Sequence, residues 1–100
     1  MSKNKIEAQV HDLSQVLQEK DELYKNIIAK NSYIDAYHFL LEYGHPNPKE
    51  LFDLILSSND PRLMYETALN IDGAPVDLLY RKVVDIKNIY FIKLFESDIL

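Results

Sequence analysis

Histidines and carboxylates are the side chains with which this sequence could do metal or acid–base chemistry. Glu7 and His11 are four residues apart, so a helix would place both on one face as two possible ligands of a transition metal. No further ligand follows at a recognisable spacing, and such sites usually have three or four protein ligands. The sequence therefore predicts no metal site.

His38 lies between Asp35 and Glu42 at helical spacing, an arrangement that resembles an acid–base cluster. Any charged helix face produces the same pattern, and we interpret it as a solvated face. His45 precedes Pro46 in a turn, where we expect it to be exposed. We predict no catalytic residue here.

Other motifs of catalysis are missing. The chain contains no Gly-rich phosphate loop, no Gly-x-Ser-x-Gly run, no His-Glu-x-x-His run and no cysteine. We therefore expect a protein that is not an enzyme and that binds no cofactor. The polar start Met1–Lys5 indicates neither a secretory signal nor a membrane anchor, so we expect a cytoplasmic protein.

Composition favours one all-α domain. The 100 residues are 47% hydrophobic and 27% charged and include only two glycines, which argues against disorder and against a turn-rich β protein. The net charge of −5 weighs against direct nucleic-acid binding and permits a basic partner.

The N-terminal segment 1–30 is expected to form one long helix, because it contains no proline or glycine and repeats apolar residues every three or four positions. One short partner could not cover this whole stripe. Either several short helices pack along it, or part of it meets a second chain. The residues that would contact a second chain are Val10, Leu13, Leu17, Tyr24 and Ile27.

About five short helices should follow, because capping residues or prolines suited to a first helical turn recur along the chain. Glu50 adds a capping box to the second of these starts, and Gly44 and Gly73 are suited to helix ends. The predicted starts are Ser32, Asn47–Pro48, Asp60–Pro61, Pro75 and Asn88.

These signals form a degenerate repeat of helical hairpins, as in a short α-solenoid-like bundle. Tyr37 matches Tyr65 and Ile55 matches Val83 at one common separation, whereas the separation of Gly44 and Gly73 is one position longer. We divide the single domain 1–100 into a long helix (1–30), two hairpin repeats (31–58 and 59–87) and a truncated terminal helix (88–100).

The stretch DPRLMYETALNIDGAPVDLL, residues 60–79, resembles short helical repeats of uncharacterised proteins from Gram-positive bacteria and their phages. The resemblance weakens over residues 31–57 and is absent from the first helix. It implies a helical-repeat fold and an origin in a phage or other mobile element.

The last residues, FIKLFESDIL, are apolar on most sides. Either this helix folds back under the long first helix, which we favour, or it offers an apolar surface to another subunit.

A non-enzymatic protein-binding role is our leading hypothesis, with the chain acting as a small regulator or inhibitor that blocks, for example, a host defence protein such as a CRISPR nuclease. One alternative is an acidic nucleic-acid mimic that binds a basic DNA-processing protein, and another is a homodimerising structural protein. The residues expected on a protein-binding surface are Asp35, His38, Glu42, Tyr43, His45, Arg62, Glu66 and Asn70.

Overall fold

The computed structural model describes the backbone of residues 2–100 and the side chains of residues 16–100. Within this part the chain forms six helices and no strand, which confirms the predicted all-α class. The helices are α1 (Ser2–Lys30), α2 (Tyr33–Glu42), α3 (Lys49–Ser57), α4 (Pro61–Asn70), α5 (Val76–Ile86) and α6 (Ile89–Asp98).

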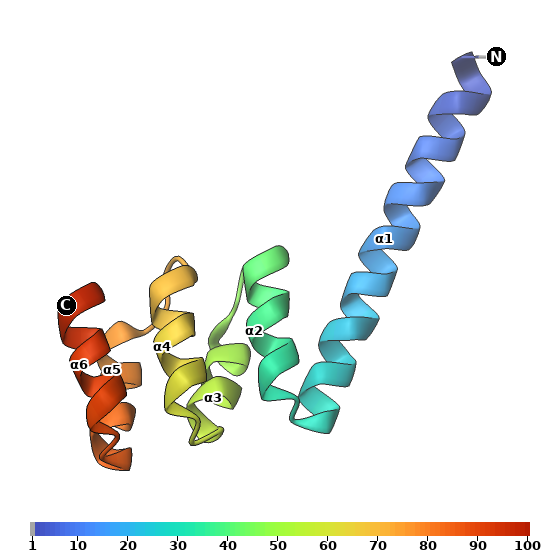
Figure 1. The fold of residues 1–100 in the computed structure, drawn as a ribbon. Helices are drawn as coiled ribbons and strands as arrows, with labels where there is room; N and C mark the ends of the chain where they lie inside the picture. The colour runs from blue at the N-terminus through green and yellow to red at the C-terminus, as the bar shows by residue number, and fades with distance from the viewer. Residues whose placement is uncertain (1) are drawn as a thin grey trace.

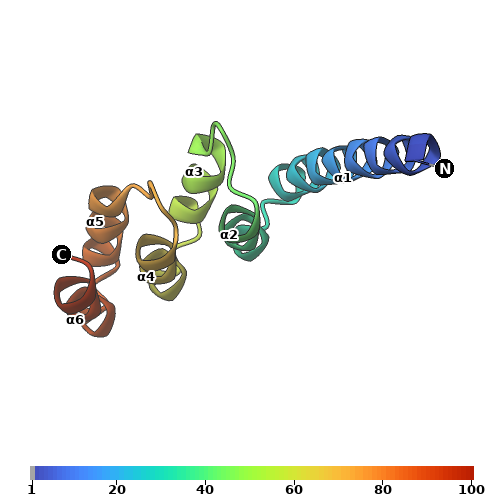
Figure 2. The ribbon, with the colours of Figure 1, turned by 90° about the horizontal axis from the view of Figure 1, so that it is seen from above.

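The helices form an array of two layers. In Figure 1, α2, α4 and α6 stand side by side in chain order, and α1 projects from the end next to α2. Figure 2, in which these three helices are seen end-on, shows α3 and α5 lengthwise as a second layer. α2 packs against α3 and α4 packs against α5, and the helices of each pair cross steeply.

The turns that lead into α2, α4 and α6 recur at a constant interval along the chain. Asn31, Asn59 and Lys87 are evenly spaced, and all adopt left-handed backbone conformations, with φ of 51°, 56° and 65°. The residue after each one is the N-cap of the next helix, namely Ser32, Asp60 and Asn88. A single left-handed residue ends a helix and reverses the chain within a short turn, so it sets the period of the array.

The end of α1 has the same register as α3 and α5. Leu23-Tyr24 lies one repeat before Leu51-Phe52 and two repeats before Leu79-Tyr80, and Ile27 is buried like its counterparts Ile55 and Val83. Leu23, however, is 42% exposed, whereas Leu51 and Leu79 are fully buried. α2 packs on α3, and α4 packs on α5.

Helix caps agree with the sequence at two of the predicted starts. The Asp60 carboxylate accepts hydrogen bonds from the backbone N–H groups of Arg62 and Leu63, and the Asn88 side chain accepts one from Phe91. The Ser32 side chain caps nothing, because its hydroxyl donates to Asp35 instead.

The predicted capping box at Asn47 is wrong. α3 begins one residue later than expected, at Lys49, and Pro48 occupies its N-cap position without a side-chain capping bond. The backbone N–H of Asn47 donates to Nδ1 of His45, so this residue belongs to the preceding turn.

The predicted fold-back of the last helix under the first is also wrong. α6 packs against α4 and α5 at the end of the array opposite α1, and its Phe95 is fully buried there. The short turn after α5 returns the chain directly onto these two neighbours.

The long helix predicted over residues 1–30 includes residues 1–15, whose side chains lie outside the described part of the chain. The predicted residues Glu7, Val10, His11 and Leu13 are among them. None of the described helices is long and apolar enough to cross a membrane.

Candidate functional site

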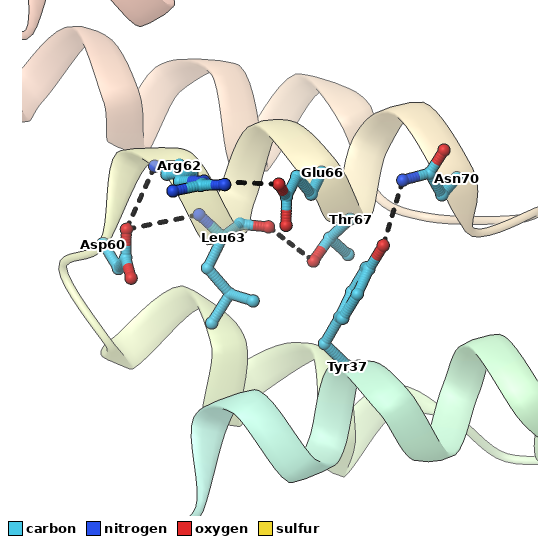
Figure 3. Close-up of polar contacts among 7 residues, drawn as sticks. All are labelled: Tyr37, Asp60, Arg62, Leu63, Glu66, Thr67 and Asn70. Carbon is cyan, nitrogen blue, oxygen red and sulfur yellow. Dashed lines mark hydrogen bonds and ion pairs between the residues drawn. The ribbon is translucent and has the colours of Figure 1, made fainter.

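A groove runs along the outer side of the array between α2 and α4. Its volume is about 280 Å³, and Figure 3 shows several of the side chains around it. Apolar side chains form its floor, Ile34 and His38 of α2 form one rim, and charged side chains at the start of α4 form the other rim. The residues that line this α2–α4 groove are Ile34, Tyr37, His38, Asp60, Arg62, Leu63 and Glu66.

The two repeats differ in the side chains that pack between neighbouring first-layer helices. Between α4 and α6, the ring of Tyr65 contacts the rings of Phe91 and Phe95, with centroid distances of 5.9 and 5.8 Å. The equivalent positions one repeat earlier hold Leu63 and Thr67, which are smaller. The interface between α2 and α4 therefore has smaller side chains at these two positions, and Leu63 lines the groove.

Buried Thr67 is satisfied within its own helix. Its hydroxyl donates to the carbonyl oxygen of Leu63 at 2.7 Å, one turn earlier, as Figure 3 shows. A buried hydroxyl with such a partner costs little stability. Thr67, at the position that Phe95 occupies one repeat later, therefore leaves no buried polar group without a hydrogen-bond partner.

The charged rim belongs to the first two turns of α4. Nε of Arg62 lies 3.3 Å from a carboxylate oxygen of Glu66, an ion pair at the favourable i, i+4 spacing. The carboxylate of Asp60 faces the start of the helix, where backbone N–H groups favour negative charge. This rim combines two carboxylates with one guanidinium group.

A polar bridge ends the groove. The side-chain amide of Asn70 donates a hydrogen bond to the hydroxyl of Tyr37 at 2.9 Å, which links the two helices (Figure 3). A second hollow of about 310 Å³ lies beyond it, at the C-terminal ends of α2 and α4. The residues that line this second hollow include His45, Phe52, Asn70 and Asp72.

The structure brings only some of the predicted binding residues together. His38, Arg62 and Glu66 line the α2–α4 groove, and His45 and Asn70 line the second hollow. Asp35 and Glu42 are exposed on the same face of α2 as His38, one turn to either side of it. The remaining predicted residue, Tyr43, lies elsewhere, with its ring beneath Nζ of Lys20.

Four groove residues are missing from the sequence prediction: Ile34, Tyr37, Asp60 and Leu63. Three of them have apolar side chains that a sequence reading assigns to the core. A comparison of the two repeats position by position, with Leu63 against Phe91 and Thr67 against Phe95, is the signal that could have identified this interface.

The described residues of the predicted contact stripe on α1 differ in their surroundings. Ile27 is buried in the protein's own core, and Tyr24 stacks on His45 with ring centroids 4.7 Å apart. Partial burial and the carboxylate of Glu50, to which its hydroxyl donates, raise the pKa of Tyr24 above its ordinary value. Leu17 remains 59% exposed.

The described side chains include no group of three histidines, aspartates or glutamates that could hold a metal ion. Comparison of the chain with models of known protein families, with curated proteins and with solved structures gave no match.

Proposed function

We propose that this chain is a protein-binding module and that the α2–α4 groove is its recognition surface. The groove itself carries the proposal, because it is lined by Leu63 where the next repeat has Phe91, whose ring packs against Tyr65. Its volume lies just below the range of about 300–1,000 Å³ that small-molecule pockets occupy. This size suits one inserted side chain of a protein partner.

The exposed residues around the groove support the same role. Ile34, at the rim, is 59% exposed, and the tyrosine and leucine of the floor offer apolar contact. Apolar residues surrounded by polar ones are typical of protein interfaces. A small regulator encoded by a phage or another mobile element, as the repeat resemblance suggests, is the biological role that we favour for such a module.

Selection from a library of random peptides tests this function. We expect the selected peptides to lose at least tenfold in affinity for Ile34→Asp, which places an uncompensated charge at the rim. Leu78→Asp is the matched control, because Leu78 is 51% exposed on α5, in the other layer. Selected peptides that bind Ile34→Asp as tightly as the parent protein would contradict the proposed site.

A second candidate function is self-association through α1. Val16, Leu17 and Leu23 are exposed on a helix that projects from the array, and Leu23 occupies a position that is fully buried in both later units. Two copies could cover these residues with one another. Sedimentation should then show a dimer that Leu23→Ser weakens and Leu78→Ser does not, whereas a monomer at high concentration would exclude it.

A further inference from the structure

Most of the negative charge of this protein lies in the repeats that form the groove. The first repeat, residues 31–58, contains four carboxylates and one basic side chain, a net charge of −3, and the second, residues 59–87, contains five carboxylates and four basic side chains, a net charge of −1. Residues 1–30 are neutral overall, and residues 88–100 carry a net charge of −1. The first repeat, which contains α2, is therefore the most acidic part of the chain.

This acidic repeat forms the α2 side of the groove. No lysine or arginine occurs between residues 31 and 48, which include all of α2. Asp35 and Glu42 are exposed on the face of α2 that carries His38 of the groove. Arg62 is the one lysine or arginine among the groove's lining residues, and its guanidinium group is paired with Glu66.

The apolar floor adds a second requirement. Tyr37 and Leu63 are largely buried, whereas Ile34 is exposed. A bound side chain would therefore contact the side chain of Ile34 and the small areas of Tyr37 and Leu63 that remain exposed. An aliphatic side chain fits these surroundings, because it needs no hydrogen-bond partner when it loses its water. Positive charges on both sides of that side chain would then face the carboxylates of α2 and α4.

From this arrangement we propose that the partner presents a basic segment, in which one aliphatic side chain enters the α2–α4 groove between flanking lysines or arginines. The inference rests on the proposed function and names the chemistry of its partner. Opposite charges at an interface speed association and orient the partner, while the apolar contact holds it in place.

Two synthetic peptides test the proposal by fluorescence anisotropy: one has a central leucine flanked by lysines, and the other has the same leucine flanked by glutamates. We expect the lysine peptide to bind at least tenfold more tightly and to weaken as salt is added, because exposed charges are screened. Failure of the lysine peptide to bind, or equal binding of both, would overturn the proposal.

Charge variants then locate the interaction. Asp35→Asn and Glu42→Gln should each weaken the lysine peptide by about two- to fivefold, the usual value of an exposed ion pair. Asp77→Asn and Asp85→Asn are the matched controls, since they remove the same charges from exposed positions of α5. An equal effect of the α5 variants would show that only the net charge affects binding, and it would contradict binding of the peptide at the groove.

The random-peptide selection separates this proposal from the proposed function. Selected peptides that depend on Ile34 but contain no excess of lysine or arginine would contradict the proposal of a basic partner. They would still support the groove as the recognition surface. If no selected peptide depends on Ile34, both proposals fail.

Discussion

The hydroxyl of Tyr37 on α2 and the side-chain amide of Asn70 on α4 are hydrogen-bonded, and the same relationship recurs one unit later. Tyr65, the counterpart of Tyr37 in the next repeat, donates a hydrogen bond from its hydroxyl to the carboxylate of Asp98, which is the counterpart of Asn70. The repeat therefore includes a polar bridge between neighbouring first-layer helices, in addition to its apolar core.

The bridge between Tyr37 and Asn70 should contribute measurably to stability. Because the bond is partly buried, we expect Tyr37→Phe and Asn70→Ala to show a coupling of about 0.5–1.5 kcal/mol in a double-mutant cycle. Urea unfolding of the parent and the three variants provides the measurement. Additive effects of the two substitutions would show that the bond contributes nothing.

The second bridge predicts a dependence of stability on pH. Hydrogen bonds from Tyr65 and Ser97 lower the pKa of Asp98, so the stabilisation is complete above the unfolded-state pKa and is lost as the pH falls through the lowered value. The bond to Asp98 raises the pKa of Tyr65, so stabilisation on that side is lost as the pH rises through the raised value.

Thermal unfolding between acidic and alkaline pH should therefore show a plateau around neutrality with a fall at each end. Tyr65→Phe should lower the plateau and reduce both falls, because it removes the shared bond. Lys87→Ala, at a residue outside this bridge, serves as the control. An unchanged profile in Tyr65→Phe would contradict the assignment.

A substitution that fills the groove should weaken peptide binding while the protein remains folded. Leu63→Phe introduces at α4 the residue that α6 has at the equivalent position, so we expect the groove to close and the selected peptides to lose at least tenfold in affinity. The neighbouring empty volume should keep the change in unfolding free energy within about 1.5 kcal/mol. Full retention of peptide binding, with Leu63→Phe still folded, would show that recognition occurs elsewhere.

The N-cap residue of α4, Asp60, should stabilise the protein more than the N-cap residue of α2, Ser32. We expect Asp60→Ala to destabilise the protein by about 1 kcal/mol, because two backbone N–H groups lose their acceptor. Ser32→Ala should cost about 0.5 kcal/mol or less, since the Ser32 side chain makes no capping bond. Equal losses in chemical denaturation would contradict the difference in capping.

Lys87 offers a stabilising substitution. It adopts a left-handed conformation at the end of α5, where the two earlier units have asparagine, and a β carbon is unfavourable in that conformation. Lys87→Gly should therefore raise the unfolding free energy by about 0.5–1 kcal/mol. Lys87→Ala retains the β carbon, so an equal gain from alanine would rule out this explanation.

Local signals in the sequence predict much of the fold. Asp60 before Pro61 marks the start of α4, and Gly73 marks the chain reversal after it, because capping and left-handed turns depend on residues that are adjacent in sequence. The spacing of Tyr37 and Tyr65 likewise indicates the repeat. Such features need no knowledge of distant contacts.

Other features depend on tertiary packing and could not be predicted in this way. The apolar pattern of residues 91–100 is equally compatible with contact to α1 or to α4 and α5, and only the geometry of the array selects the latter. Leu63 has the sequence pattern of an ordinary core residue, and only its position between α2 and α4 places it beside the groove. Asn47 lacks its predicted capping role because His45 accepts its backbone N–H.

The neighbour-to-neighbour packing of this array has a consequence for how it unfolds. Among the described residues, α1 contacts only α2 and α3, and α6 contacts only α4 and α5, so no contact joins the two ends. In such a linear arrangement either end helix can detach while the remaining helices keep their neighbours. Amide hydrogen exchange should be slowest in α3 and α4 and faster toward both ends, so the middle of the array, where the groove lies, would be the last part to open.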